Sequence, residues 1–178
     1  MRILAISGSL RAASSNTSLL QAAIGLAPPR VTVALYAGLG AIPPFNPDLD
    51  GDLVDAAVSD FRAQLREADA VLISGPEYAH GISGVLKNAL DWLVGSGELV
   101  DKPIGVINAS PRAQHAHEQL IEILTVMTGV LVPGATIAVP LLGRNLDAAG
   151  IAADPDIAEP VRAALAALVQ GAGSTGST

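Results

Sequence analysis

The chain has 178 residues, of which 50% are hydrophobic but only 3% aromatic, and its formal net charge is −7. Because it holds no cysteine, a disulfide, a thiol nucleophile and a cysteine-ligated metal are excluded. The length fits one sizeable core, so we expect a single domain over residues 1–170. The acidic balance argues against a nucleic-acid partner, and no apolar run reaches the roughly 18 residues of a membrane span. We therefore expect a cytoplasmic protein.

A polar stretch near the start of the chain, residues 8–17 (GSLRAASSNT), follows a predicted buried strand at 2–7 and precedes a predicted helix at 18–26. The N–H groups and the dipole of a helix start favour an anion at such a crossover, and Gly8 permits a tight turn. The stretch carries one formal charge, that of Arg11. Its other hydrogen-bonding side chains are Ser9, Ser14, Ser15, Asn16 and Thr17. We interpret it as a phosphate cradle.

The cradle predicts a single phosphate group. Neither the GxxxxGK[ST] pattern of nucleoside triphosphate sites nor the GxGxxG pattern of dinucleotide sites is present. The alternative is an ordinary helix cap without a ligand, since Ser and Asn are favoured at helix starts. A cap needs only one hydroxyl, so the number of polar side chains favours the phosphate.

Strands and helices alternate along the rest of the chain. Further strands are predicted at 31–35, 70–74, 104–108 and 130–139, the last interrupted by Pro133-Gly134. Helices are predicted at 52–67, where Leu53 begins the apolar face, and at 85–94, 115–128 and 157–169. Residues 36–51 form a long loop, either functional or an ordinary crossover packed down by Phe45. We expect the low-complexity end, 171–178, to be disordered.

This alternation predicts an α/β fold, a doubly wound five-stranded parallel sheet with helices on both faces. In such sheets ligands bind beyond the carboxyl ends of the strands. Three segments leave strands at that edge, namely 8–17, 75–84 and 108–117. We expect them to meet at one crevice.

Two motifs together resemble the NADPH-dependent FMN reductase family, which includes quinone, azo-dye and chromate reductases. They are GSLRAASSNT and, at residues 76–92, PEYAHGISGVLKNALDW; the resemblance covers residues 2–139. It implies a flavodoxin-like fold with sheet order 2-1-3-4-5 and noncovalently bound FMN. It also implies NADPH or NADH as electron donor and a small acceptor, such as a quinone, azo compound, metal oxyanion or free flavin, reduced by a ping-pong mechanism.

The resemblance further implies roles for individual residues. Ser9, Arg11, Ser14, Asn16 and Thr17 would hold the FMN phosphate, with the backbone of Ser15. The turn formed by Pro76, Glu77, Tyr78 and Ala79 would lie along the isoalloxazine edge, and Ser110 would contact the cofactor.

The chain departs from the family pattern at three places. Ala79 stands where the family commonly has Asn, and Ser83 where it has Pro. The segment 110–117, SPRAQHAH, lacks the usual glycine pair and brings Arg112 or a histidine to the cofactor rim.

No catalytic side chain is expected, because a flavin carries out hydride transfer itself. We predict no metal site, since His115 and His117 are two residues apart and face different sides of a helix. His80 lines the substrate face or is a solvent-exposed loop histidine. Tyr78 stacks near the flavin or anchors its turn. Glu77 accepts backbone N–H bonds, pairs with an arginine or is simply solvated.

Trp92 lies off the apolar stripe of the helix 85–94. An exposed tryptophan often marks a protein contact, so we predict a homodimer or homotetramer across this helix. Two other functions stay open, an electron carrier resembling flavodoxin and a cofactor-free binding module. The choice between NADPH and NADH is also open, with Arg112 and Arg144 as candidate contacts of the 2′-phosphate.

Overall fold

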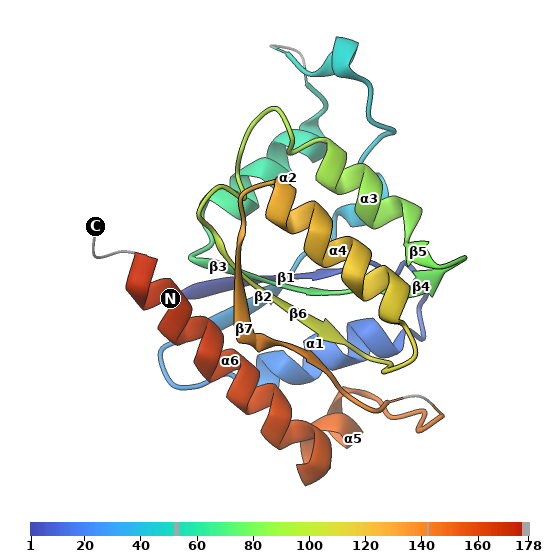
Figure 1. Cartoon of the computed structure of the whole chain (residues 1–178), viewed down its shortest axis with the longest axis vertical. Helices are drawn as coiled ribbons and strands as arrows, with labels where there is room; N and C mark the ends of the chain where they lie inside the picture. Colours follow the sequence, from blue (N-terminus) through green and yellow to red (C-terminus); the bar gives the residue numbers. More distant parts are fainter. Residues whose placement is uncertain (52–53, 142, 176–178) are drawn as a thin grey trace.

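A computed structural model describes residues 1–51, 54–141 and 143–175 and shows a five-stranded parallel sheet (Figure 1). Its strands are β1 (Arg2–Ser7), β2 (Thr32–Leu35), β3 (Ala70–Ser74), β6 (Pro103–Asn108) and β7 (Val130–Ala138). Their order is β2-β1-β3-β6-β7, and every neighbouring pair is parallel. This confirms the predicted order, because β4 and β5 form a separate hairpin.

Helices cover both faces of the sheet, as predicted (Figure 1). One face packs against α1 (Ser15–Gly25), α5 (Ala148–Ala153) and α6 (Pro155–Thr175). The other packs against α2 (Ala56–Arg66), α3 (Gly84–Asp91) and α4 (Gln114–Val126). Alternate residues of β1 serve the two cores: Ile3 belongs to the first and Leu4 to the second. No helix among the described residues is long and apolar enough to cross a membrane.

Two polar side chains set the starts of α1 and α2. The Ser14 hydroxyl accepts from the N–H of Thr17, so α1 begins three residues earlier than its apolar pattern predicts. Asp55 caps α2 by accepting from the N–H of Ala57, 2.7 Å away. The predicted start of that helix, at Asp52 and Leu53, lies outside the described residues.

The segment after β3 forms a short hairpin of β4 (Glu77–Tyr78) and β5 (Gly81–Ile82). Its two turn residues have positive φ, 50° at Ala79 and 61° at His80. Such a turn usually contains Gly or Asn, so nothing in the local sequence predicts a hairpin. The hairpin docks on α4, where the N–H of Ile82 donates to the Gln119 side chain at 2.8 Å.

The long loop before α2 contains two 3₁₀ turns, Leu39–Ala41 and Pro47–Leu49, and is packed onto α3. Trp92 donates its indole N–H to the Pro43 carbonyl at 2.8 Å, and its ring meets Phe45 edge-on with centroids 5.1 Å apart. Trp92 is only 1% exposed, so the prediction of an exposed tryptophan was wrong. The loop covers the ring, and Trp92 gives no support to assembly across α3.

The helix α6 extends to Thr175, which corrects the disorder predicted for residues 171–175. A Cβ on Gly171 would lie 2.8 Å from Val132 of β7, and Ala172 packs against the core. This close packing on the sheet holds the last helical turn, whereas composition alone indicates a flexible tail. Residues 176–178 lie outside the described residues.

Ending the chain after Gln170 should lower the free energy of unfolding by roughly 1 kcal/mol, more than the ~0.5 kcal/mol typical of a surface change. The truncation removes the contacts of Gly171 and Ala172 with the core. Urea denaturation measures the difference. A chain ending at Thr175 is the control and should match the full chain. Equal stability of the shorter truncation would show that these contacts do not contribute.

Candidate functional site

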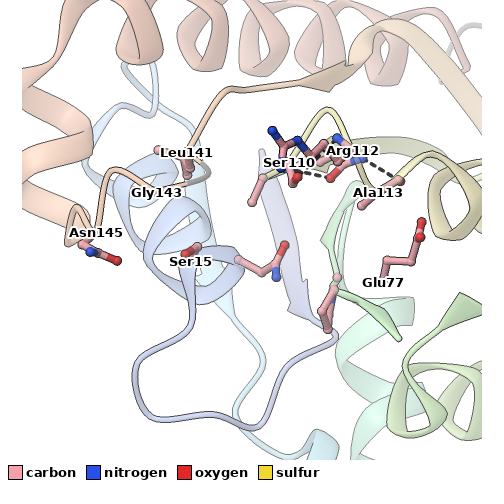
Figure 2. A pocket seen from close by; sticks show the side chains of 13 residues that line it. Ser15, Glu77, Ser110, Arg112, Ala113, Leu141, Gly143 and Asn145 are labelled. Atoms are coloured by element: carbon pink, nitrogen blue, oxygen red, sulfur yellow. Dashed lines mark hydrogen bonds between the residues drawn. The ribbon is translucent and has the colours of Figure 1, made fainter. Parts of the chain in front are cut away.

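A cavity of about 460 Å³ lies at the carboxyl edge of the sheet, where the segments after β1, β3 and β6 meet as predicted (Figure 2). It is lined by Ser15, Asn16, Gly75, Pro76, Glu77, Asn108, Ala109, Ser110, Arg112, Ala113, Leu141, Gly143 and Asn145. The sequence reasoning missed the last wall, which follows β7. The topology could have indicated this wall, because β7 is parallel to the other strands and the segment after it leaves the sheet at the same edge.

The cradle presents Ser15, labelled in Figure 2, to the cavity. Asn16 lines the cavity beside it. The Asn16 Oδ1 accepts from the buried Ser74 hydroxyl at 2.9 Å, which leaves the amide N–H₂ as a free donor group. The first turn of α1 carries no acidic residue, so nothing within it offsets the positive end of the helix dipole. The cavity therefore has a donor-rich end suited to one anion.

Other cradle side chains bind within the protein. The hydroxyls of Ser7 and Thr17 lie 2.7 Å apart, and the Ser9 hydroxyl accepts from the N–H of Arg11 at 3.4 Å. The Ser14 hydroxyl caps α1. These bonds shape the loop that carries Ser15 and Asn16.

Ser83 joins the cradle to the turn after β3. Ser83 is 2% exposed, and its hydroxyl donates to the Gly8 carbonyl at 2.6 Å and accepts from the N–H of Leu86 at the start of α3. Gly8 in turn donates its N–H to the Ser74 carbonyl at 2.8 Å. Ser83, which stands where the family commonly has proline, thus forms a hydrogen bond that joins two walls of the site.

Glu77 fixes the hairpin against α4. Its carboxylate accepts from the N–H of Ala116 at 2.9 Å, at a helix start where Ala113 provides no side-chain cap. Of the three interpretations of Glu77, the structure supports acceptance of backbone N–H bonds, although the donor belongs to α4. A carboxylate at a helix N-terminus is favoured by the helix dipole.

Asn108, which the sequence reasoning missed, shapes the opposite wall. Its side chain accepts from the N–H of Ser110 and donates to the Ala113 carbonyl, both at 3.0 Å. A single polar residue at the end of a buried strand carries no motif, so nothing in the sequence singled it out.

Of the predicted cofactor residues, five line the cavity: Ser15, Asn16, Pro76, Glu77 and Ser110. The other six lie outside its lining: Ser9, Arg11, Ser14, Thr17, Tyr78 and Ala79. Arg11 and Tyr78 are exposed, Tyr78 at 52%. The direct contacts of these six with a cofactor stay predictions.

The histidines lie along α4 and the hairpin. His80 and His115 are exposed, and their rings stack with centroids 4.3 Å apart. Neither residue lines the cavity. Burial lowers the pKa of His117, with Glu118 acting in the opposite direction, and the buried Nδ1 of His117 has no hydrogen-bond partner in the described structure. The described residues contain no group of three or more His, Cys, Asp or Glu arranged to hold a metal ion.

Comparison with known proteins places these features in a family. Residues 1–141 match the NADPH-dependent FMN reductase family. An NAD(P)H-dependent FMN reductase of Pseudomonas aeruginosa is 39% identical over 159 residues, which cover 83% of this chain and 85% of that protein. An NADPH:quinone oxidoreductase of Arabidopsis thaliana is 38% identical over 112 residues, covering 61% of this chain and 57% of that protein.

A solved structure agrees with the sequence matches. The flavoenzyme NAD(P)H:(acceptor) oxidoreductase FerB of Paracoccus denitrificans superposes with a TM-score of 0.84 at 28% identity, over 97% of both chains. The family match spans most of the sequence, including the cradle, all five strands of the sheet and the start of the fourth cavity wall. The chain therefore belongs to the NADPH-dependent FMN reductase family.

Proposed function

We propose that this cavity holds FMN and that the protein, an NAD(P)H-dependent oxidoreductase by family, passes electrons to a small acceptor by a ping-pong mechanism. The acceptor classes are quinones, azo compounds, metal oxyanions and free flavin. The observation that carries the proposal is a donor-rich helix start opening into a cavity of about 460 Å³. That volume lies within the usual range for small-molecule sites.

The residues present fit FMN. The Asn16 amide and the N–H groups at the start of α1 would hold the phosphate, with Ser15 at the same end. Pro76 and Glu77 on one side and Ser110 on the other would hold the ring system. When bound, FMN would accept a hydride from the nicotinamide and would pass electrons to the second substrate. The protein orients both reactants, and no side chain has to transfer a proton.

The cavity lining favours a reductase over an electron carrier. None of the described lining residues is aromatic, so no side-chain ring of this lining would cover a flavin face. An uncovered face leaves room for a nicotinamide to stack. A cofactor-free binding module would not require the free amide group of Asn16 or the unneutralised start of α1.

We also propose a homodimer or homotetramer in the cytoplasm. Trp92 does not support assembly, but Leu10, Leu49 and Tyr78 are each more than half exposed and would be covered favourably by a second copy. Sedimentation velocity measures the state of assembly. A chain without cysteine is compatible with a reducing compartment.

The ping-pong mechanism is tested on the FMN-loaded protein. NADPH or NADH should bleach the flavin absorbance without an acceptor present, and a quinone should restore it. Initial rates at several quinone concentrations should give parallel double-reciprocal lines. Converging lines would contradict the ping-pong order. Flavin that neither nucleotide bleaches would favour the electron carrier, and a protein that fails to bind FMN would favour the binding module.

Arg11→Ala should weaken FMN binding by roughly 1.5 to 3 kcal/mol, the range for a hydrogen bond to a charged group. Arg11 carries the one formal charge of the cradle. Fluorescence titration of the apoprotein with FMN measures the change. Arg30→Ala removes an equal charge before β2 and should leave the affinity unchanged. If both variants bind FMN like the wild type, Arg11 does not contact the phosphate.

Substitutions at Ala79 test the turn beside the cavity. Ala79→Asn should stabilise the protein by up to about 1 kcal/mol, because Asn tolerates the φ of 50° better than Ala. Its rate of NAD(P)H oxidation should change by less than about tenfold. Ala79→Pro should lose FMN, because proline fixes φ near about −65° and the turn cannot form.

Urea denaturation and flavin retention measure both variants. The Ala79→Asn result stays informative even if the proline variant is too unstable to purify. An Ala79→Pro protein that folds and keeps FMN at the wild-type affinity would show that the turn does not contact the ring.

A further inference from the structure

Most of the cations of this acidic chain are engaged within the protein. The sequence has 10 Lys and Arg against 17 Asp and Glu. Ion pairs hold the side chains of Arg2, Arg62, Arg66, Lys87, Arg144 and Arg162. Lys102 donates to the carbonyls of Leu65 and Ala68 at 3.0 and 2.7 Å. Within the described residues, only the guanidinium groups of Arg11, Arg30 and Arg112 remain without a hydrogen-bond or ion-pair partner.

Two of these three cations lie at the carboxyl edge of the sheet, and one of them, Arg112, lines the cavity. Arg30 precedes β2, at the opposite edge of the sheet, whereas Arg11 follows β1 and Arg112 follows β6 at the carboxyl edge. Arg112 lines the cavity beside Ser110, as Figure 2 shows, and its N–H donates to the Ser110 hydroxyl at 3.3 Å. The structure thus holds the Arg112 backbone while leaving its guanidinium exposed and available to an anion.

Among the described residues, no carboxylate forms an ion pair with Arg112. Glu77, the one acidic residue of the described lining, accepts from the N–H of Ala116 and forms no ion pair with an arginine. Arg144, the other loop arginine considered from the sequence, pairs with Asp154 at 3.0 Å. The choice between the two arginines as an anion contact is therefore decided in favour of Arg112.

We propose that Arg112 binds a phosphate group of the nicotinamide dinucleotide that donates electrons. The inference rests on the proposed function and names the residue that recognises its first substrate. FMN has a single phosphate, which the cradle would take. The free guanidinium of Arg112, on another wall of the cavity, is therefore available to a second anion. A guanidinium can donate two parallel hydrogen bonds to two oxygens of one phosphate. In a protein of net charge −7, such a local cation is what makes an anionic substrate bind.

The test measures binding of NADP⁺ and NAD⁺ to the FMN-loaded protein by calorimetry, so it does not depend on turnover. Arg112→Gln should raise the Kd for NADP⁺ by at least about tenfold, as loss of a hydrogen bond to a charged group predicts. Arg30→Gln makes the same charge change at the other edge of the sheet and should leave the Kd unchanged. Arg112→Lys keeps the charge without the planar fork and should give an intermediate Kd. All three variants should keep the wild-type affinity for FMN.

The two nucleotides identify the phosphate. A loss confined to NADP⁺ assigns Arg112 to the 2′-phosphate and makes it the source of a preference for NADPH, whereas equal losses for NADP⁺ and NAD⁺ assign it to the pyrophosphate. Unchanged binding of both overturns the proposal. It is also overturned if Arg112→Gln weakens FMN binding while the affinity for the dinucleotides stays the same.

The proposed function can fail separately. A wild-type protein that binds NADP⁺ through Arg112, but whose flavin neither NADPH nor NADH bleaches, would contradict the oxidoreductase function and leave the anion contact standing. A wild-type protein that binds FMN and neither dinucleotide would overturn both.

Discussion

The close approach of the turns after β1 and β3 is the constraint on which the site depends. A Cβ on Gly8 would lie 3.1 Å from the Cα of Gly75 and 3.2 Å from the Ser83 hydroxyl, so only glycine fits without a shift of the backbone. The Ser83 hydroxyl then connects the Gly8 carbonyl to the start of α3. Because the cradle, the turn and a helix start are held together in this way, the positions of the first two cavity walls follow from one contact.

The charge distribution keeps this edge of an acidic protein open to anions. The start of α1 lacks acidic residues, and the carboxylate of Glu77 is directed to the start of α4. Elsewhere every described arginine except Arg30 is paired with a carboxylate, even in the largely buried pair of Arg62 with Asp50. The net charge of −7 therefore describes the surface as a whole and not the cavity, where the free cation and N–H donors lie.

The backbone of the hairpin shows which property is affected by Ala79, which stands where the family commonly has asparagine. Ala79 occupies a left-handed position, which a side chain other than Gly or Asn adopts at a cost in free energy. The asparagine common in the family suits this backbone conformation, so its absence bears on the stability of the turn before it bears on the flavin. The contacts of Glu77 and Gln119 with the hairpin hold the turn in place despite this cost.

The sequence by itself determined the alternation of strands and helices and the place of residues 8–17 between the first strand and the first helix, because these depend on local patterns. The sheet order was predicted from the resemblance to the family, and the structure confirms it. The burial of Trp92 was decided only by the tertiary structure, since a loop from another part of the chain covers the ring. The same holds for the last turn of α6, which Val132 of β7 supports, and for the cavity wall around Asn145. It also holds for the hydroxyl of Thr17, which lies 2.7 Å from that of Ser7 at the end of β1. In each case the deciding partner is set by the folded backbone, and neither composition nor periodicity identifies that partner.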